Sequence, residues 1–370
     1  MRWLLTFFLL SLLIPTLDNL PGGTSVKYIF TLGMAFLFPL GLDKVMVFPN
    51  RWVENLLFSL MMLGGILAEF FRPIPGSMLY LVVMPLSYCA YHYIRSYKLS
   101  VHQVLLVATV ILLLSLPPRQ FSSRGSLMGM FGNPNVMAPI ATFGLYLVLC
   151  IRKRIPSVIT AVFFVLVTYL IYKTYSRAGQ VAYLVFIMGW FVQDVLLKVN
   201  FRILSLLGII AALFLYYSMI TTGTLTYIEL ANSALQSNKT VDFSERDKLF
   251  ELFIDEVKTN PVGIGFGQSQ KFTEARTQYR FSPHNLYLKT TVEGGWLFAA
   301  GAAGLFIYLF LTTKSALTTS FLFAICLRGL FESSTPFTLG MTSALLFLPF
   351  YLNEYSILPR RAAPAADQFG

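Results

Sequence analysis

The residues of this chain best suited to chemistry are a few arginines that lie at the ends of apolar segments. Arg177 sits between two such segments, Arg246 opens a predicted amphipathic helix, and Arg119 and Arg124 flank a short polar stretch. An arginine held between membrane spans is costly unless it is paired, and few acidic residues lie on the same predicted side. Guanidinium groups bind phosphate oxygens in a bidentate fashion, so these positions predict an anion site. The alternative is that each arginine snorkels to lipid headgroups.

His284 is the histidine whose position fits a chemical role. It lies in Ser282-Pro283-His284-Asn285, where a long polar stretch meets an apolar segment, and Glu293 follows within a few helical turns. Imidazole titrates near neutrality, so His284 is a candidate base for a hydroxyl group. The alternative is a histidine that caps a helix at the membrane surface. The chain has 3 dispersed histidines, so no histidine-based metal site and no cofactor is expected.

Composition places these residues in a membrane protein. Of the 370 residues, 56% are hydrophobic and 12% are charged, whereas soluble domains carry about 25% charged residues. The net charge of +11 is spread by ones and twos between the apolar segments. This pattern is typical of topology-setting charge beside membrane lipids and argues against nucleic acid as a partner.

The apolar segments predict an all-α, polytopic membrane protein with about twelve transmembrane helices and one long structured periplasmic loop. We expect nine helices in residues 1–221, the loop in 222–283, three helices in 284–358 and a cytoplasmic tail in 359–370. The expected spans are residues 2–17, 26–41, 52–70, 77–94, 101–117, 135–151, 156–173, 179–198, 202–221, 284–311, 315–330 and 338–357.

The long loop carries the signals of an amphipathic helix. Ser244 is suited to cap it, Leu249, Phe253 and Val257 fall on one face, and Pro261 ends it. Lys and Arg are more frequent in the short segments on the opposite side, which places the loop outside the cytoplasmic membrane.

Several short motifs occur in order around this loop, and together they resemble the O-antigen ligase and polymerase family. They cover residues from about 119 to 300, and Arg328 to Glu332 fits the family's penultimate span. One departure is Ala178, where many members have a second glycine. The motifs are Phe131-Gly132-Asn133-Pro134-Asn135, Ser176-Arg177-Ala178-Gly179, Glu245-Arg246, Asn260 to Gly267, His284-Asn285 and Glu293-Gly294-Gly295.

The resemblance implies a metal-independent glycosyltransferase of the bacterial inner membrane. Its donor would be a saccharide linked to polyprenyl (undecaprenyl) diphosphate, and its acceptor a growing glycan or lipid A-core, on the periplasmic face. The choice between ligase and polymerase stays open. The implied catalytic residues are His284, Arg177 and Arg246, and the implied substrate-binding residues are Arg119, Arg124, Asn135, Ser176, Asn285 and Glu293.

Two other classes of protein remain as alternatives. A transporter or flippase of lipid-linked oligosaccharides also suits a chain of many spans, although the long outer loop argues against it. A peptidoglycan polymerase would use a loop carboxylate instead, and the loop offers Glu229, Asp242, Glu251 and Asp255.

Overall fold

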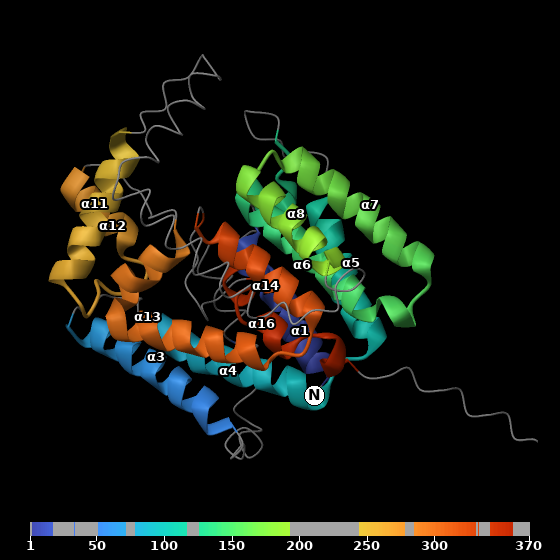
Figure 1. The fold of residues 1–370 in the computed structure, drawn as a ribbon, viewed down its shortest axis with the longest axis horizontal. Coiled ribbons are helices and arrows are strands. Elements are labelled where there is room, and N and C mark those ends of the chain that lie inside the picture. The colour runs from blue at the N-terminus through green and yellow to red at the C-terminus, as the bar shows by residue number, and fades with distance from the viewer. Residues whose placement is uncertain are drawn as a thin grey trace, which may run out of the picture.

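The computed structural model is helical throughout the part of the chain that it describes (Figure 1). That part comprises residues 2–17, 33, 51–71, 78–116, 126–192, 244–277, 285–330, 332 and 341–357, without the side chains of 244–250 and 277. The predicted all-α class is confirmed for these residues, which contain no strand but only isolated bridge residues, such as the pair Leu99 and Ile357.

The helices follow the predicted apolar segments closely. The α-helices are α1 (Arg2–Ser11), α3 (Trp52–Phe71), α4 (Met78–Tyr97), α5 (Val101–Ser115), α6 (Pro134–Ile151), α7 (Ser157–Thr174), α8 (Arg177–Phe191), α11 (Ser244–Thr259), α12 (Ser269–Thr277), α13 (Leu286–Thr312), α14 (Ala316–Arg328), α15 (Met341–Ala344) and α16 (Leu348–Tyr351). Short 3-10 helices are η1 (Ile14–Thr16), η4 (Gly129–Phe131), η5 (Arg152–Arg154) and η7 (Glu354–Ser356).

Four helices of the described chain are long and apolar enough to cross a membrane: Trp52–Phe71, Pro134–Arg154, Ser157–Thr174 and Leu286–Thr312. Shorter apolar helices occupy Arg2–Thr16, Val101–Ser115 and Ala316–Arg328. Predicted span 202–221 and the whole predicted tail, 359–370, lie outside the described residues, as does predicted span 26–41 apart from residue 33. The count of about twelve therefore stays a prediction.

The last predicted span, 338–357, differs from expectation within its described part. Residues 341–357 form α15, a turn, α16 and η7 rather than one continuous helix. Pro349 has no N–H, so it cannot donate to the carbonyl of Leu345 four residues earlier, and the helix is interrupted there. The hydroxyl of Tyr146 donates to the carbonyl of Leu352 (2.8 Å), which fixes the end of this segment against α6.

The helices form two packed groups joined by α1, α14 and α16 (Figure 1). In one group α3 lies along both α13 and α4, and in the other α6 packs against α5, α7 and α8. The pair α11 and α12 covers the first half of α13. A shared core of aromatic and aliphatic side chains, including Phe143, Tyr146 and Phe321, fills the space between the elements.

A buried polar cluster ties α3, α4 and α16 together. Glu54 is 2% exposed, accepts a hydrogen bond from the hydroxyl of Tyr351 and lies 3.1 Å from Nε2 of His92. Arg51 approaches the other ring nitrogen of His92 (3.0 Å). His92 is therefore buried within the bundle and contacts groups of the bundle itself.

Candidate functional site

Three of the sequence motifs end in capped helix N-termini. The side chain of Asn133 accepts from the backbone N–H of Asn135 at the start of α6 (2.8 Å). Ser176 caps α8 through the N–H of Gly179 (3.2 Å), and Asn285 caps α13 through the N–H of Leu288 (2.9 Å). Helix N-termini carry partial positive charge, so capping and anion binding favour the same places in a fold.

The α6 and α8 motifs meet directly. Ser176 Oγ donates to Asn135 Oδ1 (2.6 Å), which joins two predicted substrate residues that are far apart in sequence. Arg177 follows as the first residue of α8. Its side chain is exposed and forms no hydrogen bond or ion pair with the residues that the structure describes. The guanidinium is therefore available to a ligand at the N-terminal ends of α6 and α8.

Gly179 allows the close approach of these two helix ends. A Cβ atom added at Gly179 would lie 2.4 Å from Cβ of Ala138 in α6. Ala178 is only partly buried, so a methyl group is accommodated there. Ala178, where many family members have a second glycine, thus lies at the position of the motif at which the packing leaves room for a methyl group.

The start of α13 and the end of α14 join the same site. The N–H of Leu286 donates to the carbonyl of Gly329 (2.7 Å), and Asn285 Nδ2 donates to the carbonyl of Leu330 (3.2 Å). Arg328, the last residue of α14, donates from Nη2 to the carbonyl of Asn135 (2.6 Å). The structure therefore brings Asn135, Ser176, Arg177 and Asn285 to one end of the bundle.

A second part of the site is the turn between α11 and α12, which packs against a kink in α13. Gly295 has φ 76 and ψ 177, which interrupts α13 after Glu293 and Gly294. The freed carbonyls of Val292 and Glu293 accept from the N–H groups of Ile264 (2.8 Å) and Gly265 (3.0 Å). A side chain at Gly295 would collide with the carbonyl of Val262, so the kink requires glycine in a left-handed conformation.

Glu293 is fully buried at this kink. Its carboxylate accepts a hydrogen bond from Ser269 Oγ (2.8 Å) at the start of α12. Glu69 of α3, also buried, accepts from the N–H of Phe266 (3.0 Å). Both carboxylates therefore position the turn between α11 and α12. Substrate binding by Glu293 stays a prediction.

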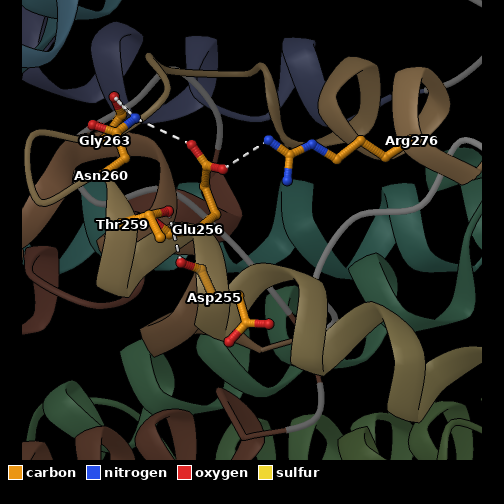
Figure 2. Close-up of polar contacts among 6 residues, drawn as sticks. All are labelled: Asp255, Glu256, Thr259, Asn260, Gly263 and Arg276. Carbon is orange, nitrogen blue, oxygen red and sulfur yellow. Dashed lines mark hydrogen bonds and ion pairs between the residues drawn. The ribbon is translucent and has the colours of Figure 1, made fainter.

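The α11–α12 pair is held together by one carboxylate, as Figure 2 shows. Glu256 is 4% exposed and accepts from Asn260 Nδ2 (3.2 Å) and from Arg276 Nη2 (3.1 Å). Asn260 also donates to the carbonyl of Gly263 (3.1 Å), which shapes the turn. The predicted apolar face is confirmed at Phe253 and Val257, which are buried with Ile264 and Val292.

The remaining predicted site residues are not placed at this site. Arg119, Arg124 and His284 lie outside the described residues. Arg246 lies in the first turn of α11, as predicted, but its side chain is not described. Asn285, the neighbour of His284, is placed at the site by its contact with Leu330.

Sequence reasoning missed the part that Arg328 plays here. The residue was noted as part of a motif but not as part of the site. The signal was present in Asn135 and Pro139, because a proline four residues after Asn135 leaves the Asn135 carbonyl without its helical donor. Ser269 gave no such signal, because its contact with Glu293 depends on the kink at Gly295.

Comparison with known families supports this picture. Residues 162–302 match the family described as O-antigen ligase. This part of the chain belongs to the O-antigen ligase family. The O-antigen ligase domain contains Ser176, Arg177, the α11–α12 pair and the kinked half of α13. Asn135 and Arg328 lie on either side of it in sequence and contact each other. No curated protein matches the chain.

The arrangement is suited to holding a compact polyanion. Three capped helix N-termini, the exposed Arg177 and the buried Arg328 present positive charge or partial positive charge at one end of the bundle. Within the described residues no three His, Cys, Asp or Glu side chains gather as metal ligands. The requirement for a metal is a matter for experiment.

Proposed function

We propose that the protein transfers a saccharide from a polyprenyl diphosphate donor to a glycan or to lipid A-core. The observation that carries this proposal is the convergence of Asn135, Ser176, Arg177 and Asn285 at one end of the bundle. The membership of residues 162–302 in the O-antigen ligase family supports it. We place the reaction on the periplasmic face of the inner membrane, where the predicted loop lies.

The chemistry follows from the donor. A hydroxyl oxygen of the acceptor attacks the anomeric carbon, the bond from that carbon to the phosphate oxygen breaks, and the diphosphate leaves with the bonding electrons. Negative charge develops on the leaving oxygen, and arginine side chains stabilise it. We assign this role to Arg177 and Arg246, and we assign donor contacts to Arg119 and Arg124.

His284 is proposed to take the proton of the attacking hydroxyl. Its neighbour Asn285 is fixed by α13 and by the end of α14, so the chain enters the site at this point. A hydrogen bond from His284 that only orients the acceptor is the alternative role. The two roles differ in their pH dependence, as described below.

Deletion of the gene tests the proposed function and separates its two forms. Surface polysaccharide from the deletion strain should be analysed on a gel, with the wild-type gene restored as control. Core that carries single repeat units identifies a polymerase, and bare core with polymer still attached to lipid identifies a ligase. An unchanged polysaccharide pattern would contradict the proposal. Accumulation of donor on the cytoplasmic face would identify a flippase.

A further inference from the structure

Arg328 is a buried cation, and a buried charge is costly unless other groups compensate it. It is the last residue of α14 and is 9% exposed. Its Nη2 donates to the carbonyl of Asn135, whereas its Nε is buried without a hydrogen-bond partner among the residues that the structure describes. Buried polar groups are normally paired, so an unpartnered guanidinium N–H indicates that a ligand or water completes the site.

The bond to Asn135 has a structural cause. In α6 the carbonyl of Asn135 would accept from the N–H of residue 139, but this residue is Pro139. Arg328 supplies the missing donor at 2.6 Å. This bond uses Nη2 and leaves the Nε–H without a hydrogen-bond partner among the described residues.

The surroundings add to the positive charge. The N-terminus of α6 begins at Pro134, one residue before the contact with Arg328, and Asn135 in turn accepts from the capping residue of α8. No carboxylate of the described chain forms an ion pair with Arg328, although Glu332 acts on it electrostatically from the following turn. A buried cation beside helix N-termini is costly, and a bound anion offsets that cost.

We propose that Arg328 is a third cationic group of the donor site and contacts a non-bridging oxygen of the diphosphate through its Nε–H. This inference rests on the proposed function. In that role Arg328 approaches the leaving group from the protein interior, whereas Arg177 approaches from the exposed end of α8. Its contact would strengthen as the sugar–phosphate bond breaks and charge collects on the diphosphate.

The test separates ligand contact from structural duty by restoring the missing helical donor. Pro139→Ala gives α6 an N–H that can bond to the Asn135 carbonyl, so the fold no longer depends on Arg328. The variants to compare are the wild type, Pro139→Ala, Pro139→Ala with Arg328→Met, and Arg177→Ala. Each is purified at full length in detergent, checked by thermal unfolding, and titrated with farnesyl diphosphate, with farnesol as the uncharged control.

We expect Pro139→Ala to bind farnesyl diphosphate as the wild type does. The double variant should bind about ten- to hundredfold more weakly, which is the loss of one charge-assisted contact. Equal binding by Pro139→Ala and the double variant would overturn the role of Arg328 while leaving the proposed function intact. If the wild type shows no binding beyond that of farnesol, the proposed function fails with it.

A second substitution keeps the test decisive if the double variant does not fold. Pro139→Ala with Arg328→Lys retains the charge but cannot present the planar guanidinium. Weaker binding than that of Pro139→Ala supports a directional contact with the diphosphate, and unchanged binding overturns it. The single variant Arg328→Met completes the comparison. If it loses both stability and farnesyl diphosphate binding, and Pro139→Ala restores both, then Arg328 serves only the fold.

Discussion

The residues at the proposed site divide into those that hold the backbone and those that are free to meet a ligand. Asn135, Ser176 and Asn285 each form hydrogen bonds to neighbouring elements. Arg177 is exposed and forms none with the described residues, so its charge is not used by the fold. Substitutions in the first group should alter both stability and transfer, whereas substitution of Arg177 should alter transfer alone.

Ser176→Ala tests the first group. The change removes the cap of α8 and the hydrogen bond to Asn135, and it should lower the free energy of unfolding by about 1 kcal/mol. Transfer should fall with it, because Arg177 follows in the frayed turn. Ser176→Thr keeps the hydroxyl group and should stay near the wild type. Thermal unfolding and a transfer assay measure the two effects, and wild-type values for Ser176→Ala in both would contradict this account.

His284→Gln tests the proposed base. If His284 takes the proton, the substitution should lower the transfer rate about a hundred- to ten-thousandfold with donor binding nearly unchanged. The wild-type rate should also fall as the pH drops below the pKa of the imidazole, because a protonated ring cannot accept the proton. Rates measured between about pH 5.5 and 8 decide the matter. An active His284→Gln with a flat profile would leave only the orienting role.

At the scale of elements, the site depends on a kink and on a turn that fits it. The turn of residues 260–267 is held by α13 through Glu293, by α3 through Glu69 and by its own helix through Glu256. The O-antigen ligase domain therefore docks its α11–α12 pair, which carries Arg246, on the membrane helices through buried carboxylates and backbone bonds. Damage at the kink should release the pair.

Gly295→Ala tests this docking. The left-handed φ of 76 and the contact with the carbonyl of Val262 leave no room for a Cβ atom. We expect faster protease cleavage in the α11–α12 pair and a loss of transfer. Gly304→Ala is the matched control, because there the new methyl group meets only the end of the Leu57 side chain. Equal cleavage rates for the two variants would contradict the docking model.

Hydrophobic patterning predicted the helices, and the motifs indicated helix ends that the structure brings together, because both depend on local sequence. Asn135, Ser176 and Asn285 were identified in this way, and all three lie at the same end of the bundle. The sequence did not predict that residues 341–357 form several short helices, or that Arg328 donates to the carbonyl of Asn135. Each involves a proline and a contact distant in sequence: Tyr146 donates to the carbonyl of Leu352 beyond Pro349, and Arg328 donates to the carbonyl that Pro139 leaves without its helical donor. Such contacts are not visible in the sequence.

At the scale of the whole molecule, basic residues gather at the end of the bundle opposite the proposed site. The end opposite the proposed site carries Arg2, Arg51, Arg152, Lys153 and Arg154, and Arg2 and Arg154 bond to the backbone carbonyls of Tyr97 and Ile357. Basic residues favour the cytoplasmic side of a membrane. The proposed site would then face the periplasm, which is where we place the transfer.

Cysteine labelling tests this orientation with a matched pair. Lys258 in α11 and Lys153 in η5 are both exposed and lie in elements at opposite ends. In spheroplasts an impermeant maleimide should label Lys258→Cys, and it should label Lys153→Cys only after lysis. The wild type controls for labelling of the protein's own three cysteines, of which Cys150 and Cys326 are buried and Cys89 is half-buried. The reverse pattern would place the proposed site on the cytoplasmic side.

Reconstituted transfer tests the central claim most directly. The purified protein in lipid vesicles is given a polyprenyl diphosphate-linked saccharide and its acceptor, with EDTA present. We predict transfer by the wild type and by Lys153→Ala, little by Arg177→Lys and none by Arg177→Ala, with all four proteins unfolding at similar temperatures. Arg177→Lys should fail because a point charge cannot replace the bidentate guanidinium. Transfer by Arg177→Ala at the wild-type rate, or wild-type transfer that stops in EDTA and returns with magnesium, would contradict the account.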